Sequence, residues 1–209
     1  MDKVVIQGRS KLKGEVEVSG AKNSALPIMA AALLSDKTSV IENVPDLRDI
    51  RTMMNLLSSL GAEVQYENGT LTICPGKDLK TVAPYDLVST MRASVCVMGP
   101  LLARMGHVEV SLPGGCVIGP RPIDLHIKGL KALGARIEIE HGFVKARVRR
   151  KLRGGEIYLG GAFGSSVLAT ANVLTASVLA KGTTTIVNAA CEPEIVDLAR
   201  FLKLMGAKI

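Results

Sequence analysis

The sequence repeats one pattern three times, and this repeat constrains the fold more than any other feature. Leu-Gly-Ala occurs at residues 60–62 and 133–135, and Met-Gly-Ala follows at 205–207, which gives a period of roughly seventy residues. Before each triplet come an apolar helical segment, a short strand-like segment and an amphipathic helical segment, in that order. Hairpin-like segments follow the first two triplets, at 63–73 and 136–148. The pattern predicts one αβαββ unit used three times, with the last copy cut short.

The two helices of each unit differ in their apolar patterns. The first is apolar on nearly all sides, whereas the second has apolar residues at i, i+3 and i+4 opposite charged positions. This difference predicts an α/β fold in which helices lie inside and sheets lie outside. Gly61, Gly134 and Gly206 follow the second helices, at the position where a left-handed residue commonly ends a helix.

The repeat also predicts how the chain is divided. We expect units at about residues 22–84, 85–160 and 161–209, which together form one domain spanning 22–209. The third unit stops at Ile209, on what should be its first closing strand. Either the natural chain continues past Ile209 or this domain lacks its last hairpin.

The composition predicts a cytoplasmic protein. The 209 residues are 47% hydrophobic but only 3% aromatic, so aliphatic side chains must fill the core. No uninterrupted apolar run reaches the roughly 18 residues that span a bilayer, and the N-terminus lacks the apolar stretch of a signal peptide. Cys74, Cys96, Cys116 and Cys191 are too widely separated for a CxxC pair or a disulfide framework. We interpret all but Cys116 as buried or half-buried small hydrophobic residues.

The positive charge points to an anionic ligand rather than to nucleic acid. The net charge is +7, but the basic residues are scattered except at 145–153, and aromatic residues for base stacking are few. We interpret 145–153 as a solvated strand or the edge of a hairpin. A positive field also suits a small substrate with several negative charges.

Residues 111–124, with the sequence SLPGGCVIGPRPID, are predicted to form a loop because closely spaced glycines and prolines interrupt any helix or strand. Cys116 lies in the middle of this loop, close to Arg121. A nearby cation favours the thiolate form, which is the reactive one. From the residues alone, a reactive thiol and an inert loop cysteine are both open.

Lys22 and Asn23 open the first apolar helix and are candidates for anion binding. An ammonium group and the free N–H groups of a helix N-terminus would converge there on a negative charge. The alternative is an ordinary helix start in which Asn23 or Ser24 is the N-cap. Arg92 is one charge within an apolar segment, so it needs either an anionic ligand or an internal carboxylate as partner.

Two further segments admit both a structural and a binding role. Asp124 either caps the helix that follows the loop or contacts a ligand, and His126 in that helix is interpreted as a helix-surface histidine without a catalytic role. The glycine-serine turn at 164–167 precedes the third apolar helix and would suit a diphosphate, although many helices begin in this way without any ligand.

Four segments together resemble the UDP-N-acetylglucosamine enolpyruvyl transferase family. They read VSGAKNSALPI near the start, YDLVSTMRAS at 85–94, SLPGGCVIGPRPIDLHI at 111–127 and EPEIVDLARFL at 192–202. The resemblance runs along the whole chain but covers only about the first half of the family's usual length. It implies an inverse α/β barrel-like domain of three αβαββ units. It also implies that residues 1–21 form strands that pack with a second domain, which is absent from this chain.

The resemblance implies a role for each candidate residue. Cys116 is the expected general acid, which protonates C3 of phosphoenolpyruvate, can form a covalent adduct with it and is the target of fosfomycin. Lys22 and Arg121 are expected to bind the phosphate, Asn23 the amino-sugar, and Arg92 a part of the substrate site. The expected uracil and diphosphate contacts are Arg121, Pro122, Ile123, Asp124, Leu125, Gly164, Ser165, Ser166 and Val167. Many family members carry a lysine at this last turn, and this chain does not.

The implied reaction is the first committed step of peptidoglycan synthesis, and thus serves cell-wall biogenesis, cell shape and cell division. The enolpyruvyl group passes from phosphoenolpyruvate to the 3′-hydroxyl of UDP-N-acetylglucosamine, phosphate is released, and no metal or organic cofactor is expected. The family's general base and further arginines belong to its other half, so this chain alone is expected to be inactive.

Two alternative functions remain to be considered. The sister transferase acting on shikimate 3-phosphate shares the repeat, but its pattern lacks the cysteine loop. The rival from another class is a non-catalytic half-molecule that binds the UDP-sugar or awaits a partner.

Overall fold

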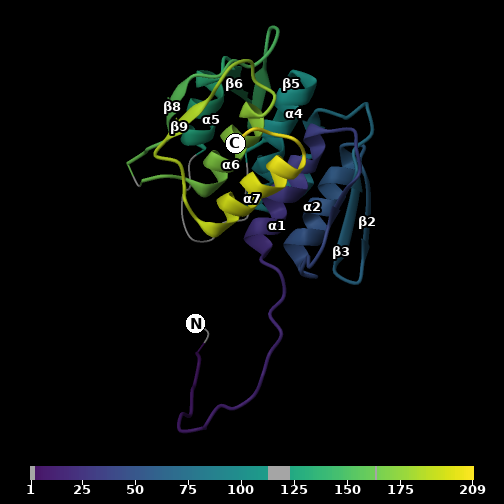
Figure 1. Cartoon of the computed structure of the whole chain (residues 1–209), viewed down its shortest axis with the longest axis vertical. Helices are drawn as coiled ribbons and strands as arrows, with labels where there is room; N and C mark the ends of the chain where they lie inside the picture. The colour runs from purple at the N-terminus through teal and green to yellow at the C-terminus, as the bar shows by residue number, and fades with distance from the viewer. Residues whose placement is uncertain (1–2, 113–122, 163) are drawn as a thin grey trace.

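A computed structural model describes residues 3–112, 123–162 and 164–209. The expected order of elements is present twice in full, and its first three members occur a third time (Figure 1). The elements before the second unit are α1 (Lys22–Ala31), the 3-10 helix η1 (Ala32–Leu34), β1 (Ser39–Ile41), α2 (Arg48–Ser59), β2 (Glu63–Glu67) and β3 (Thr70–Cys74).

The second unit has the same order but begins with an extra strand. Its elements are β4 (Val82–Ala83), α3 (Tyr85–Val88), the 3-10 helix η2 (Arg92–Val97), α4 (Met98–Met105), β5 (His107–Ser111), α5 (Asp124–Ala132), β6 (Arg136–Glu140) and β7 (Phe143–Arg147). The third consists of β8 (Glu156–Tyr158), α6 (Val167–Ser177), β9 (Thr185–Val187) and α7 (Pro193–Leu204).

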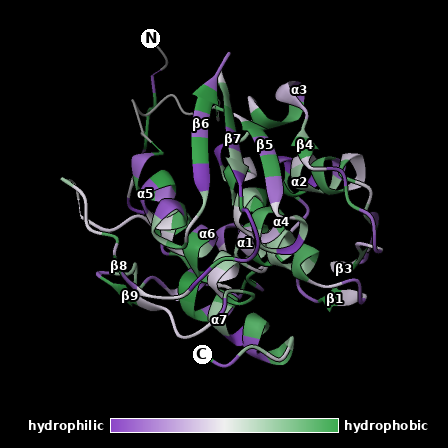
Figure 2. Ribbon diagram, turned by 90° about the horizontal axis from the view of Figure 1, so that it is seen from above, coloured by the Kyte–Doolittle hydropathy of each residue, from purple (hydrophilic) through white to green (hydrophobic). Residues whose placement is uncertain are grey.

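Each unit contributes one sheet. The strand orders among the described residues are β1-β3-β2, β4-β5-β7-β6 and β8-β9. The hairpins are antiparallel, whereas β4 pairs with β5 and β8 pairs with β9 in parallel, each across an intervening helical segment. Seen from above, the sheets lie around α1, α4 and α6 (Figure 2). The predicted arrangement of helices inside and sheets outside is confirmed.

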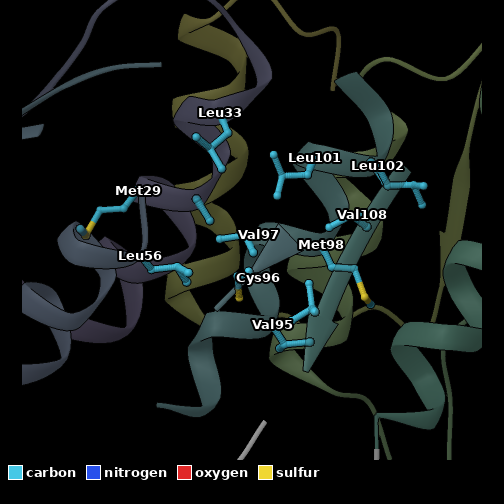
Figure 3. Close-up of a cluster of buried hydrophobic side chains, with 14 of the residues drawn as sticks. Met29, Leu33, Leu56, Val95, Cys96, Val97, Met98, Leu101, Leu102 and Val108 are labelled. Atoms are coloured by element: carbon cyan, nitrogen blue, oxygen red, sulfur yellow. The ribbon is translucent and has the colours of Figure 1, made fainter. Parts of the chain in front are cut away.

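The core forms where the apolar helices meet. All residues of α1 from Ala25 onward are buried, whereas α2 buries one stripe and exposes its charged face. Figure 3 shows Leu33 of η1 facing Val97 of η2 and Leu101 of α4, whereas Met29 points to the opposite side of α1. The predicted contrast between first and second helices is therefore confirmed.

The three glycines predicted to end helices have left-handed backbones. Gly61, Gly134 and Gly206 have φ values of +102°, +96° and +102°. After α2, the amide of Ala62 donates to the carbonyl of Leu57 and that of Gly61 to Ser58. The same pair of bonds follows α5 and α7, so all three helices end in a Schellman motif.

The prediction of a solvated strand for the basic run 145–153 is confirmed only as far as Arg147, where β7 ends, and the alternative of a hairpin edge is wrong. β7 lies between β5 and β6, inside the sheet. Lys145 and Arg147 pair across the hairpin with Glu140 and Glu138, at 3.0 and 3.4 Å. The run has basic side chains on the outer face of an internal strand and continues into the loop beyond it.

Residues 3–20 form no helix or strand and extend away from the body of the molecule (Figure 1). Their apolar side chains are exposed: Ile6 is 85% and Leu12 is 96% accessible. That this segment packs as strands against a second domain stays a prediction. Among the described helices, none combines the length and the apolar composition that crossing a bilayer requires.

Candidate functional site

An open hollow of about 370 Å³ lies where the three repeat units meet. Its walls come from the first turns of α1, α2, α6 and α7 and from the residues around the start of η2. Lys22, Asn23, Arg92 and Val167, four of the residues predicted to bind substrate, line it together. Residues far apart in the sequence thus converge on one surface.

Lys22 is the first residue of α1 and forms an ion pair at the hollow. The N-cap is Ala21, whose side chain cannot cap, so the alternative that Asn23 or Ser24 caps this helix is wrong. Lys22 Nζ lies 2.7 Å from Asp49 Oδ2, and the two side chains are 41% and 35% exposed. Because solvent reaches both groups, the pair is weak enough for an anionic ligand to compete with Asp49 for the ammonium.

Asp49 is held in place by its own helix. It lies in the first turn of α2, where the partial positive charge of the helix end favours a carboxylate. Glu194 lies in the first turn of α7 in the same way and also lines the hollow. Two carboxylates therefore face the same space as Lys22 and Arg92.

Arg92 is the first residue of η2 and is half-buried. Asn172, a buried side chain of α6, fixes the far end of this 3-10 helix. Its Nδ2 donates to the carbonyl of Val95 at 2.9 Å, and its Oδ1 accepts from the amide of Gly99 at 2.7 Å. The position of Arg92 in the second unit therefore depends on a side chain of the third.

His126 is buried, with only 1% of its surface exposed, so its interpretation as a helix-surface histidine is wrong. Its Nδ1 lies 2.8 Å from Asn172 Nδ2. Burial, and to a smaller extent the positive charge of Arg92, lower the pKa of His126 to about 3. The imidazole is therefore neutral and stays neutral at any physiological pH.

The start of α5 lies beside the hollow rather than in its wall. Ile123 is the N-cap and makes no side-chain cap bond, and Asp124 is the exposed first residue, so the alternative that Asp124 caps the helix is wrong. Leu125 packs against Gly161, where an added Cβ would come within 3.3 Å of its Cδ1. This contact brings the start of α5 next to the turn that precedes α6.

The glycine-serine turn before α6 is closed by its own backbone. Gly161 and Gly164 exchange N–H···O bonds of 2.9 and 3.1 Å, and Gly164 has φ +89°, which favours glycine. The hydroxyl of Ser166 caps α6 by accepting from the amide of Ala169 at 3.4 Å. Of this turn, Val167 lines the hollow, while Ser165 is exposed to solvent.

Cys116, Arg121 and Pro122 lie outside the described residues. Of the other cysteines, Cys96 is buried, which raises the pKa of its thiol to about 12, and Cys74 is half-buried. Both fit the interpretation as small hydrophobic residues. Cys191 is exposed, so for that residue the interpretation is wrong.

Asp49, Thr90 and Glu194 line the hollow and were not predicted as site residues. The sequence does carry a signal for two of them. The second helix of each unit has an acidic residue in its first turn, and these are Asp49, Asp124 and Glu194. Because this acidic residue recurs at the same place in all three units, it could have indicated that the site forms where the second helices begin.

The sequence matches the EPSP synthase (3-phosphoshikimate 1-carboxyvinyltransferase) family over residues 6–209. Proteins named UDP-N-acetylglucosamine 1-carboxyvinyltransferase from Methylacidiphilum infernorum and Acinetobacter guillouiae are 57% and 55% identical to it over 209 residues. Each comparison covers 100% of this chain and 49% of the relative. The chain thus spans about half the length of the curated relatives it matches.

Solved structures share the fold. The enolpyruvyl transferase NikO from Streptomyces tendae has a TM-score of 0.82 at 22% identity, covering 97% of this chain and 47% of that one. EPSP synthase from Acinetobacter baumannii has a TM-score of 0.71 at 20% identity, covering 93% and 44%. At such low identity the likeness shows the fold alone, and it agrees with the fold class expected from the repeat.

Proposed function

Because the chain belongs to the EPSP synthase (3-phosphoshikimate 1-carboxyvinyltransferase) family, we propose that it forms one half of the cleft of an enolpyruvyl transferase. The substrates of this enzyme would be phosphoenolpyruvate and UDP-N-acetylglucosamine, the substrate named in its curated relatives. The observation that carries the proposal is the hollow that gathers Lys22, Asn23, Arg92 and Val167 from all three units. The hollow supports the proposed substrates, because it brings together predicted substrate-binding residues that lie far apart in the sequence.

The phosphoenolpyruvate end of the site would lie at Lys22. Lys22 is at the start of α1, where unpaired backbone N–H groups favour an anion, and its ammonium pairs with the partly exposed Asp49. An arriving phosphate would take over this ammonium, and the cations Lys22 and Arg121 would stabilise charge on it. Asn23 would contact the amino-sugar beside it.

The chemistry proceeds by addition and then elimination. The 3′-hydroxyl oxygen of the sugar forms a bond to C2 of phosphoenolpyruvate, while Cys116 gives its proton to C3. C3 then loses a proton, the C2–O bond to phosphate breaks, and the double bond between C2 and C3 is restored. The general base that takes the hydroxyl proton would come from a second domain, in cis or in trans.

The nucleotide would lie along the start of α5 and the turn before α6. The packing of Leu125 against Gly161 supports this, since it makes one continuous surface of the two predicted nucleotide segments. The hydroxyl of Ser166 is already used as a helix cap, so the diphosphate would rely on backbone amides and on the exposed Ser165. This arrangement would replace the lysine that the family resemblance implies at the turn.

A place in the cytoplasm, at the first committed step of peptidoglycan synthesis, follows from this activity. In that role the enzyme would serve cell-wall growth, cell shape and cell division, and fosfomycin would alkylate Cys116. Residues 1–21 would pack with the second domain, which accounts for their exposed apolar side chains in this chain.

The test compares the 209-residue chain with a fusion protein, in which the chain is followed by the remaining half of the Acinetobacter guillouiae relative. Isothermal titration should show weak binding of UDP-N-acetylglucosamine to the chain alone, and phosphate release should require the fusion protein. Shikimate 3-phosphate should not support turnover. The intact relative serves as positive control, and melting curves confirm that the fusion protein is folded.

Three outcomes would contradict the proposal. The first is a folded fusion protein that binds the UDP-sugar but releases no phosphate, which would favour a non-catalytic half-molecule. The second is turnover with shikimate 3-phosphate in place of the UDP-sugar. The third is a chain that binds no UDP-sugar at all.

A further inference from the structure

A buried polar pair joins four helical segments of the molecule. His126 of α5 is 1% exposed and Asn172 of α6 is 0% exposed, and their side-chain nitrogens lie 2.8 Å apart. The same Asn172 side chain bonds to the carbonyl of Val95 in η2 and to the amide of Gly99 in α4. One side chain from the third unit is thus bonded to three segments of the second.

These bonds fix the protonation of the imidazole without reference to any titration. The amide of Gly99 can only donate, so the Asn172 atom facing it is the carbonyl oxygen, and the atom facing His126 is the amide nitrogen. An amide nitrogen also only donates, so Nδ1 of His126 accepts and carries no proton. The ring is therefore neutral with its proton on Nε2, because an imidazolium would place two donors face to face.

The neighbouring helices pack closely around this pair. A Cβ at Gly99 would lie 2.4 Å from the carbonyl oxygen of Asn172, and one at Gly129 would lie 2.2 Å from Cγ2 of Val173. Hence α4 and α5 both press directly on the same turn of α6. Within the described residues Nε2 of His126 has no partner, so the bond at Nδ1 is the polar contact that orients the ring.

The pair lies close behind the residues assigned to the substrate. His126 is in the first turn of α5, which begins at Asp124, and Val95 lies one 3-10 turn after Arg92, the first residue of η2. Asn172 is in the second turn of α6, which begins at Val167. The three segments that carry the nucleotide-sugar contacts are therefore tied together by one buried amide.

We propose that His126 is a positioning residue, whose Nδ1 bond to Asn172 holds the starts of α5, η2 and α6 at the spacing that binds the nucleotide-sugar. This inference rests on the proposed function, because it concerns the affinity of the same site. His126 would act through Arg92 and the Asp124–Leu125 segment, without touching the substrate itself.

The experiment compares two substitutions that separate the two ring nitrogens. His126→Asn places an amide oxygen near the position of Nδ1, where it can accept from Asn172, whereas His126→Gln places its amide near Nε2 and leaves Asn172 without that acceptor. The dissociation constant for UDP-N-acetylglucosamine is measured by isothermal titration on the 209-residue chain. We expect His126→Gln to weaken binding about tenfold and His126→Asn to bind within about threefold of the wild type.

Two controls separate positioning from general destabilisation. Leu71→Ala removes a fully buried side chain of β3, in the sheet of the first unit, and should lower the melting temperature without changing the dissociation constant. In the fusion protein, His126→Gln should raise KM for the UDP-sugar while kcat at saturation stays near the wild-type value. Nitrogen NMR of the imidazole should show the proton on Nε2.

Each other result overturns the inference. Unchanged binding in His126→Gln, equal weakening in the Gln and Asn variants, or equal weakening in Leu71→Ala would show that the Nδ1 bond does not set affinity. A ring protonated on Nδ1 would contradict the hydrogen-bond assignment. A wild-type chain that binds no UDP-sugar would overturn the proposed function as well, whereas the results above leave it standing.

Discussion

Two polar pairs near the hollow have nearly the same length but opposite surroundings. Lys22 and Asp49 lie 2.7 Å apart, carry full charges and are open to solvent. His126 and Asn172 lie 2.8 Å apart, are neutral and are buried. An exposed ion pair contributes little to stability and exchanges partners readily, while a buried neutral bond is costly to leave unmade. The Lys22–Asp49 pair is therefore suited to release its cation to a ligand, and the His126–Asn172 pair is suited to hold helical segments together.

The largest effect should come from breaking the buried pair. Asn172→Ala leaves the amide of Gly99, the carbonyl of Val95 and Nδ1 of His126 without their bonds, so we expect unfolding free energy to fall by about 3 kcal/mol or more. Urea denaturation measures it. Ser94→Ala is the control, because the buried hydroxyl of Ser94 has no partner among the described residues and its loss should cost under about 1 kcal/mol. Equal losses in the two variants would contradict the comparison.

Breaking the exposed pair should affect activity rather than folding. Lys22→Ala should change unfolding free energy by less than about 1 kcal/mol. Phosphate release by the fusion protein should fall about tenfold to a hundredfold, since a charge-assisted contact to phosphate is lost. Arg51→Ala is the matched control, because Arg51 forms an equally short exposed pair with Asp46 and does not line the hollow. Wild-type turnover in Lys22→Ala would exclude Lys22 from the site.

Acid should weaken the buried pair within a defined pH window. The folded-state pKa of His126 is about 3 against an ordinary 6.5, so the unfolded chain binds a proton between these values that the folded chain does not. Stability is therefore lost as the pH falls from about 6.5 toward 3, at about 1 kcal/mol per pH unit. His126→Asn should remove this contribution, and stability curves of both proteins from pH 7 to 5 measure the difference. Parallel curves would mean that the pKa of His126 is not lowered in the folded protein.

The smallest expected difference is in the order of thiol labelling, which depends on the exposure and the pKa of each cysteine. Burial raises the pKa of Cys96 to about 12, so this thiol should be the slowest to react with iodoacetamide. We expect Cys116 to be labelled first and the exposed Cys191 after it. Mass spectrometry after limited labelling gives the order. Preferential reaction of Cys191 would weaken the assignment of Cys116 as the reactive thiol.

The sequence predicted those features of the fold that depend on local pattern. The repeat, the contrast in burial between first and second helices, and the helix ends at Gly61, Gly134 and Gly206 all follow from spacing along the chain. The parallel pairings of β4 with β5 and of β8 with β9 were missed. The strands β4 and β8 are only two and three residues long, and tertiary pairing rather than propensity forms them.

Only some residues of the candidate site could be predicted from the sequence, because the hollow is formed by residues from different units. Lys22 and Arg92 lie within specific sequence motifs, whereas no local sequence pattern indicated that Asp49 and Glu194 would face the same hollow. His126 is different, because its place was readable. It stands at i before Leu130 at i+4 and Leu133 at i+7, on the apolar stripe of α5, and this pattern indicates burial. Its polarity led to the wrong interpretation.

The recurrence of one unit gives the domain an internal pseudosymmetry that differs between its two ends. Where the second helices stop, the three copies are nearly interchangeable, each closing on a left-handed glycine. Where the first helices start, the copies have diverged into an ammonium at Lys22, a guanidinium at Arg92 and a capped, uncharged turn before Val167. A ligand without symmetry of its own requires such divergence. Replacing a residue by its counterpart from another unit should therefore be tolerated where the second helices end. The same replacement should disrupt the site where the first helices start.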